Sequence, residues 1–173
     1  MDRRSHQDPK AKNVTPWKRP HRTAIADTGH DAYREREHVP EPSYCGGCGV
    51  IREEGRWAWG DRAKGAQEHT CPACRRIADN YPAGFLELSG DFLASHREEI
   101  GNLIKNEAEA ESHEHPLNRL MHMEPAGEGV LSITTTDVHL PRRIGEALHG
   151  AYKGEFSYEY AEDDTVVHAT WRR

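Results

Sequence analysis

The stretch from residue 45 to residue 74, CGGCGVIREEGRWAWGDRAKGAQEHTCPAC, begins and ends with a CxxC motif. The two motifs hold all 4 cysteines of the chain and are separated by 22 residues. A CxxC motif brings two sulfur atoms close enough to bind one ion, and four thiolates match the tetrahedral coordination of Zn²⁺. Glycines at 46, 47 and 49 suit the tight turn around such an ion. We therefore predict one Zn²⁺ per chain, bound by Cys45, Cys48, Cys71 and Cys74.

Two other interpretations of the cysteine pairs are disulfide bonds and a redox-active site. Disulfides persist in oxidising compartments, and the polar N-terminus shows no secretory signal peptide. A redox CxxC normally occurs once, beside a βαβ pattern, whereas this chain carries the motif twice. We therefore expect a cytoplasmic protein with reduced, metal-bound thiols.

Composition and charge are uneven along the 173 residues. Hydrophobic residues make up only 35% of the chain and charged residues 30%, so part of it is expected not to pack into a core. No apolar run approaches the roughly 18 residues of a membrane span. The net charge is −6, yet residues 1–22 hold seven Lys/Arg against two Asp, and residues 91–129 hold three Lys/Arg against nine Asp/Glu. This distribution argues against a generally basic nucleic-acid binder but leaves a basic arm.

Three segments follow from these patterns. Residues 1–43 read as a disordered, basic and proline-rich tail, residues 44–90 as a four-cysteine zinc-ribbon module, and residues 91–173 as an α+β domain. The basic arm in the tail is either a solvated segment or a nucleic-acid contact, in which the aromatic ring stacks on a base. Its candidate residues are Trp17, Lys18, Arg19 and Arg22. Within the module, Trp57 and Trp59 are expected to cover the metal as a small core; contact with nucleic acid is the alternative.

The C-terminal half alternates strand and helix patterns. An amphipathic helix is expected from Asp91, as its N-cap, to just before Pro116, because apolar residues recur every three or four positions. A second helix over residues 138–152 should be capped by Thr136 or Asp137 and tolerate Pro141 in its first turn. Short strands are predicted at 85–88, 120–124, 130–135, 156–160 and 167–171. The expected fold is a small ββαββ-like unit with an additional amphipathic helix.

Several polar clusters are candidate binding sites. Arg75 and Arg76 follow the last cysteine and either offset the thiolate charge or contact phosphate. A second group at the start of the 138–152 helix, where backbone N–H groups are unpaired, is a candidate anion site. That group consists of His139, Arg142 and Arg143. A third group is either a second metal site or a solvated helix end: His113, His115 and His122. No catalytic motif is present, so we expect a protein without enzyme activity.

The order of these motifs also resembles a known family. Cys45-Gly-Gly-Cys48, a Gly-Arg-Trp segment, Cys71-Pro-Ala-Cys74-Arg-Arg and the stretch YPAGFLELSG at 81–90 are similar to the zinc-binding N-terminal region of the nonsense-mediated-decay-type ribosomal adaptor family. The segment TTTDVHLPRRIGEAL at 134–148 is similar to a small bacterial family that joins this module to a short α+β domain. The resemblance implies zinc binding by the four cysteines and association with the large ribosomal subunit.

These observations predict a bacterial, zinc-stabilised binding module for RNA or a ribonucleoprotein such as the ribosome. One alternative is a protein-interaction adaptor that uses the acidic helix 91–111 and the aromatic strand 156–160. Another is an enzyme or binder of a phosphorylated small ligand at the start of the helix 138–152.

Overall fold

The computed structural model describes residues 31, 33, 39–161 and 164–173. It has mixed α and β content, with two separate sheets, which confirms the α+β class. The predicted basic arm, with Trp17, Lys18, Arg19 and Arg22, lies outside the described residues. Among the helices that are described, each is too short or too polar to span a membrane.

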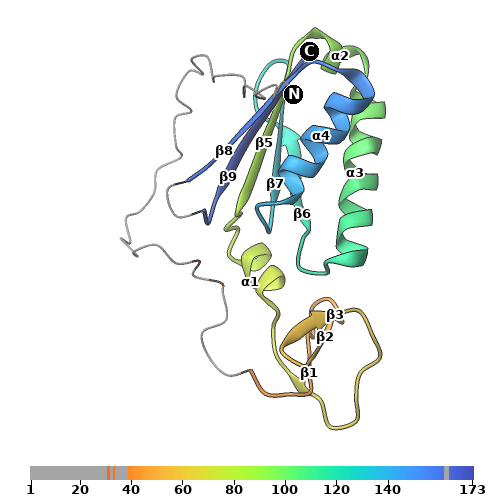
Figure 1. The fold of residues 1–173 in the computed structure, drawn as a ribbon, viewed down its shortest axis with the longest axis vertical. Helices are drawn as coiled ribbons and strands as arrows, with labels where there is room; N and C mark the ends of the chain where they lie inside the picture. Colours follow the sequence, from red (N-terminus) through yellow and green to blue (C-terminus); the bar gives the residue numbers. More distant parts are fainter. Residues whose placement is uncertain (1–30, 32, 34–38, 162–163) are drawn as a thin grey trace, which may run out of the picture.

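The first unit is a small four-stranded sheet followed by a short helix (Figure 1). Its strands are ordered β3-β2-β1-β4, and β1 is antiparallel to β2 but parallel to β4. No strand exceeds three residues, so the sheet alone buries little apolar surface. The elements are β1 (Ser43–Tyr44), β2 (Ile51–Glu53), β3 (Arg56–Ala58), β4 (Gln67–Glu68) and α1 (Pro72–Ala78).

The second unit is a five-stranded sheet in the order β6-β7-β5-β9-β8. The central strand β5 is antiparallel to β7 and parallel to β9. Both predicted hairpins are present, as β6 with β7 and as β8 with β9. The segment that we grouped with the zinc ribbon therefore supplies the central strand of the larger sheet. The strands are β5 (Gly84–Ser89), β6 (Leu120–Pro125), β7 (Val130–Thr135), β8 (Glu155–Tyr160) and β9 (Val167–Arg172).

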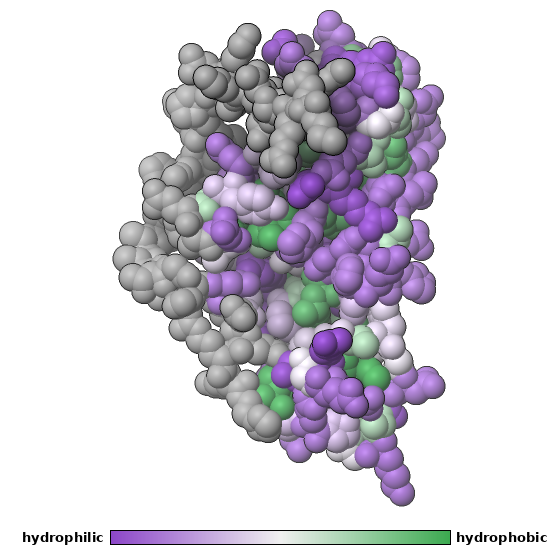
Figure 2. Space-filling model, in the orientation of Figure 1, coloured by the Kyte–Doolittle hydropathy of each residue, from purple (hydrophilic) through white to green (hydrophobic). Residues whose placement is uncertain are grey.

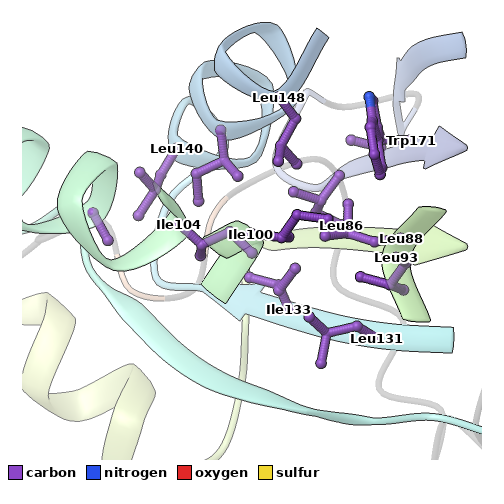
Figure 3. Close-up of a cluster of buried hydrophobic side chains, with 13 residues drawn as sticks. Leu86, Leu88, Leu93, Ile100, Ile104, Leu131, Ile133, Leu140, Leu148 and Trp171 are labelled. Atoms are coloured by element: carbon purple, nitrogen blue, oxygen red, sulfur yellow. The ribbon is translucent and has the colours of Figure 1, made fainter. Parts of the chain in front are cut away.

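All three remaining helices cover one face of this sheet (Figure 1). They are α2 (Asp91–Ser95), α3 (Arg97–Glu114) and α4 (Leu140–Tyr152). Alternate residues of β5 point toward them, so Leu86 and Leu88 are buried while Phe85 and Glu87 lie on the other face. Figure 3 shows the resulting core, in which leucine and isoleucine side chains of α3, α4, β5 and β7 meet Trp171 of β9. Hydrophilic residues cover most of the outer surface of α3 and α4 in Figure 2.

The single helix expected from Asp91 is interrupted at His96. This residue has φ −125° and ψ 25°, and it separates α2 from α3. Its ring stacks on Phe92 at a centroid distance of 3.7 Å, and Phe92 in turn lies edge-on to Trp171. The break thus places an aromatic pair against the core. Asp91 is the first helical residue and Gly90 precedes it as the N-cap, which corrects the predicted cap by one position.

A buried carboxylate fixes α3 against α4. Glu111 of α3 is only 7% exposed, and its side chain accepts hydrogen bonds from Asn118 at 2.8 Å and from Arg143 of α4 at 2.5 Å. The same guanidinium donates to Glu107 at 2.9 Å. Burial alone would raise the pKa of Glu111, but the hydrogen bonds from Asn118 and Arg143 outweigh it and lower that pKa.

We predict that Glu111→Gln lowers the free energy of unfolding at pH 7 by about 1 to 2 kcal/mol, because two charge-assisted hydrogen bonds are weakened. Since the pKa of Glu111 is lower in the folded chain, its carboxylate stabilises the fold above the ordinary pKa of about 4.3, and this contribution is lost as the pH falls through the folded value. Urea unfolding from pH 7 to pH 3 should therefore show the wild type and the variant converging in acid. Glu109→Gln, on the exposed face of α3, is the control, and an equal loss in both variants would contradict the prediction.

Candidate metal centre

The four cysteine sulfurs converge on one point. Their Sγ atoms all lie within 4.8 Å of one another, and those of Cys48 and Cys71 are 3.7 Å apart. A tetrahedron with Zn–S bonds of about 2.3 Å has edges of about 3.8 Å, so this separation fits two ligands of one zinc ion. None of the four forms a disulfide. The predicted set of metal-binding residues is therefore brought together, and it can hold one metal ion.

Two local turns place the sulfurs. In the first, Cys45 follows β1, its N–H donates to Val50 O at 2.8 Å, and its carbonyl accepts from Gly49 N at 2.8 Å. Gly49 has φ +82°, a conformation that favours glycine. In the second, Cys71 is the N-cap of α1, and its sulfur accepts from Cys74 N at 3.4 Å. The start of a helix is thereby built around the second CxxC pair.

The small core around the sulfurs differs from the predicted tryptophan pair. Trp57 packs on the buried cluster, together with Val50, Ala73 and Leu117. Trp59 is 46% exposed instead, and its Nε1–H donates to the carbonyl of Ser112, at the end of α3, at 2.7 Å. The prediction that both tryptophans cover the metal is thus correct for Trp57 and wrong for Trp59, which reaches the other unit.

Sequence reasoning missed Arg119, which lies directly beside the sulfurs. Its Nη2 donates to Cys48 Sγ at 3.1 Å and its Nη1 to Cys74 Sγ at 3.6 Å. The guanidinium also lies 5.7 Å from the ring centroid of Trp59. Arg119 is 45 residues beyond the last cysteine, in the loop before β6, and no local motif marks it. Only the packing of the two units brings it to the metal centre.

The pKa values of the cysteine thiols are shifted in different directions. Burial acts to raise the pKa of Cys45, but hydrogen bonds from the backbone N–H groups of Cys71, Cys48 and Gly47 lower it to about 7. For Cys74, burial together with its sulfur neighbours raises the pKa to about 11, and burial raises the pKa of Cys71 further. Four adjacent thiolates therefore require a cation between them, as a metal supplies.

Of the two arginines after the last cysteine, Arg76 contacts groups other than the sulfurs. Arg76 is 5% exposed; it donates to Tyr81 O at 3.1 Å and to the carboxylate of Asp31. Its guanidinium also lies 4.5 Å from the ring centroid of Tyr33. Arg75 is half-buried on α1. Arg119 places a positive charge beside the sulfurs, and Arg76 contacts Asp31 and Tyr33.

The candidate anion site at the start of α4 is already filled by the protein. Asp137 Oδ2 accepts hydrogen bonds from His139 N at 2.7 Å and Leu140 N at 3.0 Å. The helix begins at Leu140 instead of residue 138, and His139 occupies the N-cap position, which corrects the predicted cap, although the Asp137 side chain serves N–H groups at the helix start. Arg142 is paired with Glu146 at 2.7 Å, and Arg143 is held by the two glutamates of α3. Carboxylates thus engage both guanidiniums that a phosphate would use, together with the N–H groups of His139 and Leu140.

The histidines of the predicted second metal site do not meet. Within the described residues, the four cysteines are the only group of three or more candidate ligands that converge. His122 Nε2 lies 3.1 Å from Asn80 Oδ1, while His113 and His115 are exposed at the end of α3. The alternative prediction, a solvated helix end, describes His113 and His115.

Comparison with family models, with curated proteins and with solved structures finds no match to this chain. The resemblance to the ribosomal adaptor family therefore remains a prediction.

Asp137 provides a test of the capping role. Asp137→Ala should lower the free energy of unfolding by about 1 kcal/mol, because the N–H groups of His139 and Leu140 at the start of α4 lose their acceptor. Asp137→Asn should keep wild-type stability at pH 7, since asparagine caps equally well and buries no charge.

The pH dependence of the folding stability provides a second test of Asp137, with an expected direction. Burial raises the pKa of Asp137, whose Oδ1 has no hydrogen-bond partner among the described residues. The wild type should therefore gain stability as the pH falls through that raised pKa, while Asp137→Asn should not. Chemical denaturation between pH 4 and pH 7 measures both effects; an asparagine variant as unstable as the alanine variant would contradict the capping role.

Proposed function

We propose that this protein uses a structural Zn²⁺, bound by Cys45, Cys48, Cys71 and Cys74, to fold a small binding module onto an α+β domain. The observation that carries the proposal is the convergence of four thiols with separations that suit a tetrahedral ion. Four sulfur ligands fill the coordination shell, so the ion would have no open position for a substrate. A structural role is favoured over a catalytic one on that ground.

Zinc binding would supply the folding free energy that the module lacks. Its strands have two or three residues each, and its buried cluster consists of two of the cysteines, Val50 and Ala73. Structural zinc contributes about 10–16 kcal/mol of apparent binding free energy in zinc-finger peptides. The α+β domain has its own apolar core and does not depend on the ion in this way.

We predict that Cys71→Ser reduces bound zinc from one ion per chain to below one-tenth of that occupancy. Amide hydrogen exchange should then lose protection over residues 43–78, because the module has no other core, and keep it over the strands of the larger sheet. Native mass spectrometry measures the occupancy, and Thr70→Ser, next to the ligand and exposed, is the control. A Cys71→Ser variant that still binds zinc fully, or a wild type without metal, would refute the proposal.

We further propose that the zinc-stabilised module binds RNA or a ribonucleoprotein. The support comes from the sequence: seven Lys/Arg in residues 1–22 beside Trp17, and the resemblance to a ribosomal adaptor family. RNA binding driven by such an arm depends on counterion release, so affinity should fall steeply with salt. Deleting residues 1–22 should flatten the slope of log K against log salt in a filter-binding titration. No measurable RNA binding at low salt would refute this part.

A protein partner is the second candidate, favoured by the aromatic edge of the larger sheet. The edge strand β8 exposes Tyr158 and Tyr160, whose rings are 5.9 Å apart, and pairs only with β9 among the described strands. Exposed aromatic rings on a strand edge are typical of protein interfaces. A complex that survives nuclease treatment and high salt, and that Tyr158→Ser weakens, would favour this candidate over RNA.

A further inference from the structure

The four sulfurs divide into two pairs according to their hydrogen-bond donors. Cys45 and Cys71 are fully buried, and each accepts a hydrogen bond from a backbone N–H of the metal module at 3.4 Å. Cys48 and Cys74 are partly exposed, and each accepts from the guanidinium of Arg119, at 3.1 Å and 3.6 Å. A single side chain from outside the module, that of Arg119, thus donates hydrogen bonds to both partly exposed sulfurs.

Arg119 is held by the α+β domain before it reaches the sulfurs. Its backbone N–H donates to Thr136 Oγ1 at 2.8 Å, and its carbonyl accepts from Thr136 N at 2.9 Å. Its Nε donates to Pro116 O at 2.6 Å, which leaves the two terminal nitrogens for the metal centre. A guanidinium offers such donors in a rigid planar fork, which an ammonium group cannot reproduce.

The contacts around Arg119 form a small seam between the two units. We define the seam as Trp59, Ser112, Leu117 and Arg119. Trp59 donates to Ser112 O, its ring lies against the guanidinium of Arg119, and Leu117 packs on the cysteine cluster. The packing of Leu117 and the hydrogen bonds from the Arg119 terminal nitrogens involve the cysteines directly. Four thiolates around one Zn²⁺ carry a net charge of −2, which the Arg119 cation partly neutralises.

We propose that Arg119 is a positioning residue in the outer coordination sphere, which makes metal binding and docking of the module onto the α+β domain depend on each other. The inference rests on the proposed zinc site. Linkage requires that, if docking strengthens metal binding by some factor, the metal strengthens docking by the same factor. Loss of the ion would free the sulfurs from one another, remove the sulfur acceptors of the two terminal nitrogens of Arg119 and release the module, exposing the seam. Metal supply would thereby control which surface the protein presents.

The first test measures metal affinity. Arg119→Gln should bind Zn²⁺ about 10- to 100-fold more weakly in competition with a chelator, the usual loss when an outer-shell partner is removed. Arg119→Lys keeps the positive charge but loses the planar pair of donor nitrogens. Its affinity for Zn²⁺ should therefore lie between the affinities of Arg119→Gln and the wild type. Arg56→Gln, which removes an exposed arginine from β3 of the same module, is the control and should leave the affinity unchanged.

The second test separates an effect on the metal centre from general destabilisation. With Co²⁺ in place of Zn²⁺, Arg119→Gln should shift the thiolate-to-metal charge-transfer bands while the tetrahedral d–d bands remain. Trp59→Phe, which keeps a ring but loses the N–H bond to Ser112, should also weaken Zn²⁺ binding, although Trp59 is not a ligand. Hydrogen exchange over residues 112–119 should increase when the metal is removed from the wild type.

The outcomes are distinct. A wild type that binds no metal would refute the proposed zinc site itself. A metal-loaded wild type whose affinity and Co²⁺ spectrum are unchanged by Arg119→Gln, and whose affinity is unchanged by Trp59→Phe, would overturn the inference and leave the zinc site standing. Wild-type affinity in Arg119→Lys would overturn the requirement for the two-donor guanidinium. If Arg119→Gln fails to fold, Arg119→Lys and Trp59→Phe decide the question.

Discussion

The crowding of four sulfur atoms within 4.8 Å of one another is the constraint on which the metal module, residues 43–78, depends. Thiolates this close repel each other, and burial further disfavours their charge, so they can ionise together only around a cation. With that cation, two turns, four very short strands and the helix α1 have a common anchor. Without it, the same residues have almost no apolar core on which to fold.

The α+β domain is stabilised by different means. Its core is a continuous layer of aliphatic side chains between one face of a five-stranded sheet and three helices. A buried carboxylate, Glu111, adds a polar tie between the helices α3 and α4. The two units therefore have separate sources of stability, and a few side chains at the seam, Arg119 foremost, connect them. Such a small connection is in keeping with the proposed dependence of docking on metal binding.

The arginine residues show how charge in a sequence can mislead. Arg76, Arg142 and Arg143 looked like phosphate contacts, yet each is engaged by a carboxylate: Arg76 by Asp31, Arg142 by Glu146 and Arg143 by two glutamates of α3. At the start of α4, the Asp137 side chain occupies the N–H groups that an anion would need. The partner of Arg142 is four residues away, whereas those of Arg76 and Arg143 are distant in sequence. The RNA hypothesis therefore rests mainly on the basic segment 1–22.

The sequence by itself indicated the four candidate metal ligands, the mixed α and β content and most strands and helices, because CxxC spacing, apolar periodicity and turn residues act over short distances. It did not determine that residues 84–89 form the central strand of the larger sheet, since strand order depends on pairings with the distant segments 130–135 and 167–172. Nor did it mark Arg119, whose role exists only where two separately folded units meet. Local sequence patterns indicated the candidate ligands, whereas long-range packing placed the guanidinium of Arg119 beside them.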